Sequence, residues 1–94
     1  MAELLDKDEI KTRLKKVPEW DLDGSRIVRT LEFDGFDEAI GFVNDVADIA
    51  EKHGHHPDID IRYNKVVLAL TTHSAGGLTE DDFALAVAID HSAD

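Results

Sequence analysis

Apolar positions along this chain follow two periods, one typical of α-helices and one typical of β-strands. The first helical period lies near the N-terminus, at Ile10, Leu14 and Val17. Asp6, with Glu9 three residues later, is typical of a capping box at a helix start, and Pro18 cannot continue a helix. The pattern therefore predicts a first helix over residues 6–16.

Two further helices are predicted, each with one apolar face. The second is expected over residues 37–53, and its apolar face follows Phe36, Ile40, Val43, Ala47 and Ala50. Gly54 and Pro57 come directly afterwards, as is common beyond a helix end. Thr79, with Asp82 three residues later, predicts the N-cap of a third helix. The apolar positions of that helix are Phe83, Ala86, Val87 and Ile89 or Asp90.

Four strands are predicted between the helices, in two hairpins. The first hairpin joins Trp20 and Leu22, through a turn at Asp23-Gly24, to the alternating residues Ile27, Arg29, Leu31 and Phe33. The second joins a half-buried strand with Ile59, Ile61 and Tyr63, through a turn at Asn64-Lys65, to a strand over Val66–His73. Strands joined by tight turns are antiparallel. The order predicts one α+β domain over residues 1–94, with a four-stranded antiparallel sheet and three helices on one face.

Charge narrows the classes of partner that this domain can bind. The 21 acidic residues outnumber the 10 basic ones, and the net charge is −11. Such a surface repels a phosphate backbone, so neither nucleic acid nor an anionic membrane is expected as a direct partner. No apolar run approaches the roughly 20 residues that span a bilayer, and the chain has no cysteine and no signal-peptide pattern. We expect a cytoplasmic protein.

The histidines are the candidate chemical groups. Three of the five lie within four residues, at His53, His55 and His56, and a fourth, His73, is expected at the end of the last strand. If the second helix reaches residue 54, Glu51 precedes His55 by about one turn, so their side chains can meet. On the last strand, His73 alternates with the apolar face, which predicts that it lies on the open side of the sheet.

Three interpretations of these histidines remain open on the residues alone. They can be ordinary solvated side chains of a loop. His53, His55, His56 and His73 can supply three nitrogen ligands to a zinc ion, although their spacing matches no standard ligand pattern. They can also converge on one small molecule as metal-free general acids and bases, since imidazoles exchange protons near neutral pH.

Four short motifs together resemble the pterin-4a-carbinolamine dehydratase family. They are Glu51–Asp58 (EKHGHHPD), Tyr63–Val66 (YNKV), Leu70–His73 (LTTH) and Gly77–Thr79 with Asp82. Trp20 and the Phe33–Phe36 segment (FDGF) also match, so the resemblance covers residues 5–91. It implies three helices on one side of a four-stranded antiparallel sheet, in agreement with the order of elements predicted above.

The resemblance also implies an activity and a set of site residues. The family is a hydro-lyase that removes water from the 4a-hydroxytetrahydropterin left by aromatic amino acid hydroxylases, which gives quinonoid dihydropterin. It needs no metal and no other cofactor, and a functional link to phenylalanine hydroxylase is then expected. By position, the resemblance assigns catalysis to His55, His56 and His73, substrate binding to Pro57, Thr72, Ser74 and Ala75, and support to Glu51, Asp82 and Trp20. We expect His55 and His73 to transfer protons and His56 to contact the pterin. The resemblance also implies that the pterin ring is held by backbone groups of Thr72, His73, Ser74 and Ala75.

Two departures from the family pattern and two alternative functions accompany this expectation. Gly54 stands where relatives carry an acidic or amide side chain, and Ile59 stands where an aromatic residue is frequent. The alternatives are a non-catalytic binding or interaction module, and a related reaction on another pterin, including molybdopterin metabolism. Relatives associate, and a domain of 94 residues gains from association, so a homodimer or homotetramer is expected.

Overall fold

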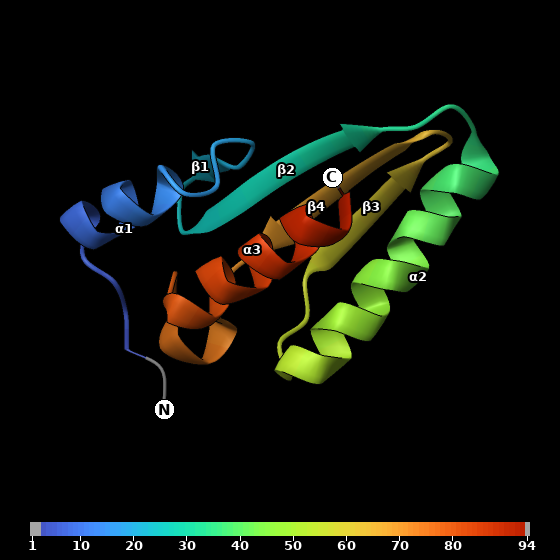
Figure 1. Ribbon diagram of the computed structural model, residues 1–94. Coiled ribbons are helices and arrows are strands. Elements are labelled where there is room, and N and C mark those ends of the chain that lie inside the picture. The colour runs from blue at the N-terminus through green and yellow to red at the C-terminus, as the bar shows by residue number, and fades with distance from the viewer. Residues whose placement is uncertain (1–2, 94) are drawn as a thin grey trace.

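The computed structural model describes residues 3–93 of the chain, and Figure 1 shows the arrangement of their elements. The helices are α1 (Lys7–Leu14), α2 (Phe36–His53) and α3 (Glu80–Ala93). The strands are β1 (Asp21–Asp23), β2 (Arg26–Glu32), β3 (Asp58–Arg62) and β4 (Lys65–Leu70), and a 3₁₀ helix, η1 (His73–Ala75), follows β4. Residues 1, 2 and 94 lie outside the described part, so the single domain over residues 1–94 stays a prediction.

The four strands form one antiparallel sheet in the order β1-β2-β4-β3. The predicted α+β class is therefore confirmed. Each hairpin pairs strands that are neighbours in sequence, and the central pair, β2 with β4, joins the two hairpins. Because β3 pairs only with β4, it is an edge strand of this sheet.

The core lies between the sheet and the helices. Alternate residues of β4 (Val66, Leu68 and Leu70) are wholly buried and belong to one cluster with apolar residues of α2 and α3. The wholly buried apolar residues are Ala39 and Val46 in α2, and Leu85, Ala86 and Ile89 in α3. Figure 1 shows α3 lying along the sheet in front of β4, with α2 beside it. No helix within residues 3–93 is long and apolar enough to cross a membrane.

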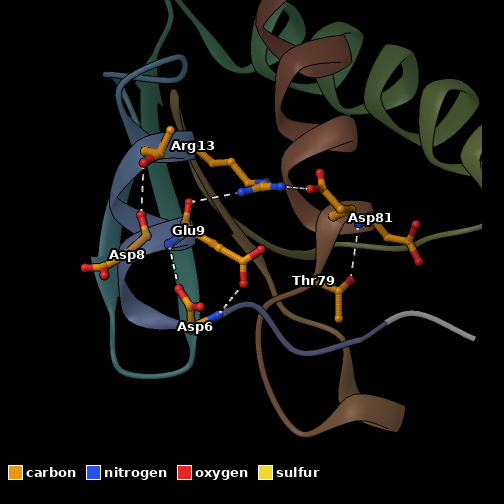
Figure 2. A network of polar contacts seen from close by, with 8 residues as sticks. Asp6, Asp8, Glu9, Arg13, Thr79 and Asp81 are labelled. Atoms are coloured by element: carbon orange, nitrogen blue, oxygen red, sulfur yellow. Dashed lines mark hydrogen bonds and ion pairs between the residues drawn. The ribbon is translucent and has the colours of Figure 1, made fainter.

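The helix starts follow the predicted capping chemistry. The Asp6 carboxylate accepts from the Glu9 amide at 2.8 Å, and Glu9 Oε1 accepts from the Asp6 amide at 3.0 Å, so the capping box of α1 is complete. The helix ends at Leu14, two residues earlier than predicted. Figure 2 shows how α1 is tied to α3: the Arg13 guanidinium forms an ion pair with Glu80.

Both hairpin turns differ by one residue from the prediction. Asp23 pairs with Arg26 and Arg62 pairs with Lys65, so the turn residues are Gly24-Ser25 and Tyr63-Asn64. Each turn begins with a residue of positive φ, 61° at Gly24 and 55° at Tyr63. The second turn is fixed by Asn64, whose side-chain amide donates to the Phe33 carbonyl at 2.9 Å.

Expectations about the extent of one strand and about burial were wrong. In α2 the predicted apolar face is shifted, because Phe36 and Ala47 are exposed whereas Ala39 and Val46 are buried. The strand predicted over Val66–His73 ends at Leu70, and His73 begins η1 instead. The strand with Ile59 is mostly exposed, because it lies at the edge of the sheet. Val87 is exposed, whereas Leu85 is wholly buried, because the inward face of α3 follows positions 82, 85, 86 and 89 at helical spacing.

Candidate functional site

The C-terminal end of α2 places the paired histidines. Gly54 adopts the left-handed conformation (φ 62°, ψ 28°) and ends the helix, as its position before Pro57 predicts. The His55 amide still donates to the Ala50 carbonyl at 3.2 Å. The chain therefore reverses within one residue, and His55 and His56 project from a short connection that leads into β3.

His55 is held by a buried carboxylate. Its Nε2 lies 2.6 Å from Oδ1 of Asp82, which is wholly buried in the first turn of α3. The other carboxylate oxygen, Oδ2, accepts from the Thr79 amide at 2.9 Å and from the Thr72 hydroxyl at 2.8 Å. Both oxygens of Asp82 are thus paired, which a carboxylate buried away from water requires. Only 15% of the His55 side chain is exposed, so the ring is fixed as well as paired.

The same contacts bring three segments of the sequence together. Thr72 lies directly before η1, Thr79 is the N-cap of α3, and His55 follows α2. The hydroxyls of Thr72 and Thr79 are 2.8 Å apart. In Figure 1 the C-terminal end of α2, η1 and the N-terminal end of α3 all lie at the same end of the molecule. The Asp82 carboxylate therefore contacts both His55 and Thr72, the residue directly before His73.

Glu51 has a different partner from the one predicted. Its carboxylate lies 2.5 Å from Nε2 of His56, not against His55. The reason is the left-handed Gly54, which turns His55 toward α3 and leaves His56 over the last turn of α2. Both members of this pair are largely exposed, 65% for His56 and 74% for Glu51. An exposed pair of this kind orients the ring weakly compared with the buried pair of His55.

The loop that begins at His73 is closed by the backbone of Thr72. The Thr72 amide donates to the Gly77 carbonyl at 3.0 Å, and the Thr72 carbonyl accepts from the amides of Ala75, Gly76 and Gly77. The amide and the carbonyl of Thr72 are thus engaged within the loop, and the expected contact of the backbone of residues 72–75 with the pterin ring stays a prediction. His73 and Ser74 are exposed on the outer side of η1, and Ala75 and Pro57 are half-buried.

Trp20 lies apart from the histidines. Its buried indole donates to Asp90 at 2.8 Å, and Asp90 also forms an ion pair with Arg29 at 2.5 Å. Asp90 is eight residues beyond Asp82, toward the C-terminal end of α3. Trp20 thus packs near the C-terminal end of α3, and its expected supporting role at the site stays a prediction.

The histidines do not converge as metal ligands. Within residues 3–93, no group of three or more histidine, cysteine, aspartate or glutamate side chains is arranged to hold a metal ion. His53 is exposed in the last turn of α2, and His55 and His56 each turn to a different carboxylate.

Thr79 is the site residue that sequence reasoning missed. The pattern of Thr79 and Asp82 predicted a helix start, and this is confirmed by the bond from the Asp81 amide to Thr79 Oγ1 at 3.2 Å. The same capping carboxylate also binds His55. The Thr79–Asp82 spacing was the signal in the sequence, whereas the burial of Asp82 and its contact with His55 are visible only in the folded structure.

Comparisons with known proteins bear on the family of this chain. The sequence model of a family described as "Pterin 4 alpha carbinolamine dehydratase" matches residues 3–92. A protein of Chloroflexus aurantiacus with the provisional name pterin-4-alpha-carbinolamine dehydratase is 60% identical over 86 residues, which are 92% of each chain. One of Acidobacterium capsulatum with the same provisional name is 57% identical over 90 residues, 96% of this chain and 97% of that one.

A solved structure supports the same relationship in three dimensions. It is the crystal structure of a "transcriptional coactivator/pterin dehydratase" from Brucella melitensis, and it superposes with a TM-score of 0.90 at 36% sequence identity. The match covers 96% of this chain and 98% of that chain. The likeness therefore extends over the sheet, the helices and the loops that carry the histidines.

Proposed function

Because this chain belongs to the pterin-4a-carbinolamine dehydratase family, we propose that it removes water from a 4a-hydroxytetrahydropterin by histidine acid–base catalysis. The observation that carries the proposal is the pair of His55 with the wholly buried Asp82. A ring held in this way keeps one nitrogen on the carboxylate and offers the other, Nδ1, to a substrate. This is the arrangement that a proton-transfer histidine needs.

The elimination requires one proton donor and one proton acceptor. The C4a–O bond breaks, and the departing hydroxide takes a proton from an acid and leaves as water. The proton on N5 passes to a base, and the electron pair that held it forms the C4a=N5 double bond. One proton is given and one is taken, with no oxidation or reduction, so two imidazoles suffice. Acid–base groups positioned in this way typically contribute about 10²–10⁴-fold to a rate.

We assign the two transfers to His55 and His73, which act from opposite faces of the pterin. The support for this pair is that Thr72, the neighbour of His73, binds the carboxylate that holds His55. His56, oriented by Glu51, contacts the substrate. Pro57, Ser74 and Ala75 form the remaining wall of the binding site on either side.

The cellular role follows from the reaction. Removal of water regenerates the pterin that aromatic amino acid hydroxylases use, so a functional link to phenylalanine hydroxylase is part of the proposal. The protein acts in the cytoplasm, as a homodimer or homotetramer, and without a metal or other cofactor. The proposal for its state of association is supported by the small size of the domain.

The test follows the decay of chemically generated 4a-hydroxytetrahydropterin by stopped-flow absorbance. We expect the protein to accelerate the decay, His73→Ala to reduce turnover at least about tenfold, and a double His55→Ala/His73→Ala variant to abolish the acceleration. His91→Ala, an exposed histidine in the last turn of α3, is the matched control and should behave as the unchanged protein.

Two outcomes would contradict the proposal. If the unchanged protein accelerates nothing at either low or molar salt, a binding module or a reaction on another pterin replaces it. If prolonged dialysis against a chelator abolishes the activity and zinc restores it, the chemistry is metal-dependent. We expect the dialysed protein to keep its full turnover.

A further inference from the structure

The hydroxyl of Thr72 contacts the Asp82 carboxylate, which in turn binds His55. Its amide and its carbonyl are fully used in closing the loop around η1. The hydroxyl is buried and lies 2.8 Å from Asp82 Oδ2 and 2.8 Å from Thr79 Oγ1. These two hydrogen bonds hold the Thr72 side chain in a fixed position against Asp82 and Thr79.

The direction of the hydrogen bonds through these hydroxyls is determined by counting protons. A carboxylate has no proton to give, so Thr72 donates its single hydroxyl proton to Asp82. Thr72 can then only accept from Thr79, which donates to it while accepting from the Asp81 amide. The chain of donation runs from Thr79 through Thr72 to Asp82, and each bond polarises the next toward the carboxylate.

We propose that Thr72 is a positioning residue, whose hydroxyl fixes the Asp82 carboxylate and through it the tautomer and orientation of His55. Oδ2 of Asp82 is held by the Thr72 hydroxyl and the Thr79 amide, which prevents rotation of the carboxylate. Oδ1 is thereby aimed at His55 and accepts the proton on Nε2. Nδ1 is then the nitrogen that a neutral ring presents as a base.

Thr72 also couples the two proton-transfer groups. It precedes His73 directly, and its carbonyl accepts the three amides that shape the loop beginning there. One residue therefore sets the place of His73 through its backbone and that of His55 through its side chain. This catalytic consequence rests on the function proposed above, whereas the control of the His55 tautomer does not.

The test replaces the hydroxyl without changing the shape of the residue. Thr72→Val keeps the size and removes the donor, Thr72→Ser keeps the donor, and Thr71→Val is the matched control. Thr71 is the preceding residue, and its hydroxyl donates to the Ser25 carbonyl at 2.7 Å, away from Asp82. Each variant is studied as the full chain, and circular dichroism establishes that it is folded.

The first readout is the tautomer of His55, from long-range ¹⁵N–¹H NMR of the neutral ring. We expect the Nε2–H form in the unchanged protein, in Thr72→Ser and in Thr71→Val, and a mixture with the Nδ1–H form in Thr72→Val. An Nδ1–H ring in the unchanged protein would overturn the proposal. This measurement does not depend on whether any variant folds. A pure Nε2–H ring in folded Thr72→Val would overturn it equally.

The second readout is turnover in the dehydratase assay. We expect kcat of Thr72→Val to fall about tenfold with KM changed less than about twofold, because an interaction that acts on the reacting histidine is lost while substrate contacts remain. Thr72→Ser should restore kcat. An unchanged kcat in Thr72→Val would remove the catalytic consequence. If the unchanged protein shows no dehydration but the tautomers respond as expected, positioning stands and the proposed function fails.

Discussion

At the scale of single residues, Gly54 decides where the two histidines point. Its φ is positive, a backbone conformation that residues with a β-carbon rarely adopt. As a result His55 points toward α3, whereas His56 points toward α2. A Cβ placed at this position would meet no atom within 4 Å. The requirement for glycine is therefore one of backbone conformation, with ample space for a side chain.

This gives a prediction for substitutions at residue 54. Gly54→Ala should lower the free energy of unfolding by about 1 kcal/mol, the usual cost of placing an L-residue in the left-handed region. Gly54→Asn should cost less, because asparagine tolerates that region and fits the open space. Urea denaturation followed by circular dichroism measures both. Equal stability of Gly54→Ala and the unchanged protein would show that α2 can end in another conformation.

At the scale of elements, α1 is the most loosely attached helix. It has no wholly buried residue, and it contacts the core only through partly buried side chains such as Ile10 and Leu14. Figure 2 shows its polar attachments, the capping box at its start and the ion pair of Arg13 with Glu80 near its end. The hydrogen bond with Arg13 lowers the pKa of Glu80, and the same bond raises the pKa of Arg13.

The sign of that shift predicts how the ion pair responds to pH. A carboxyl group with a lowered pKa in the folded state adds stability above its ordinary pKa, and this stability disappears as the pH falls through the lowered value. Glu80→Gln should therefore lower the melting temperature slightly at pH 7. The difference from the unchanged protein should vanish in strong acid, and it should shrink in molar salt, because the Glu80 carboxylate is exposed.

A control separates the ion pair from the helix dipole. Glu38 lies in the first turn of α2, as Glu80 lies in the first turn of α3, so Glu38→Gln removes a similar charge from a similar position. Thermal unfolding of both variants between pH 2 and 7 compares them. If Glu38→Gln and Glu80→Gln lose the same stability at pH 7, Arg13 contributes nothing and the dipole accounts for the effect.

At the scale of the whole molecule, β4 contributes the central part of the hydrophobic core. β4 lies between β2 and β3 in the sheet, and its inward side chains are wholly buried under α2 and α3. The site depends on this strand too, because Thr72 and His73 follow its end directly. Stability and the placement of the site therefore have the same physical origin.

A core truncation on β4 should consume much of the stability of so small a domain. Leu68→Ala should lower the free energy of unfolding by about 2–5 kcal/mol, from a total of about 5–15 kcal/mol. Leu22→Ala, which removes the same atoms from an exposed position on β1, should cost less than about 1 kcal/mol. Chemical denaturation of the two variants and of the unchanged protein measures these losses, as shifts of the denaturant midpoint. Similar losses would mean that burial of Leu68 is not what stabilises the sheet.

The elements could be predicted because their signals are local. The capping box of Asp6, the glycine after α2 and the alternation along β4 all act between residues that are close in sequence. The errors fell where a distant contact decides the outcome. The last strand stops at Leu70 because the Thr72 carbonyl collects amides from the loop beyond it, and no alternation of apolar residues reports such a bond.

Periodicity and motif spacing are properties of the chain, and they were enough to predict the class of fold, the cluster of candidate histidines and the family. The carboxylate that each histidine meets depends instead on the folded arrangement of the helices. His55 pairs with Asp82 across 27 positions of sequence, and Glu51 pairs with His56 instead. The physical reason is that a hydrogen bond depends on distances of about 3 Å in space, which the folding of α3 against α2 and η1 creates.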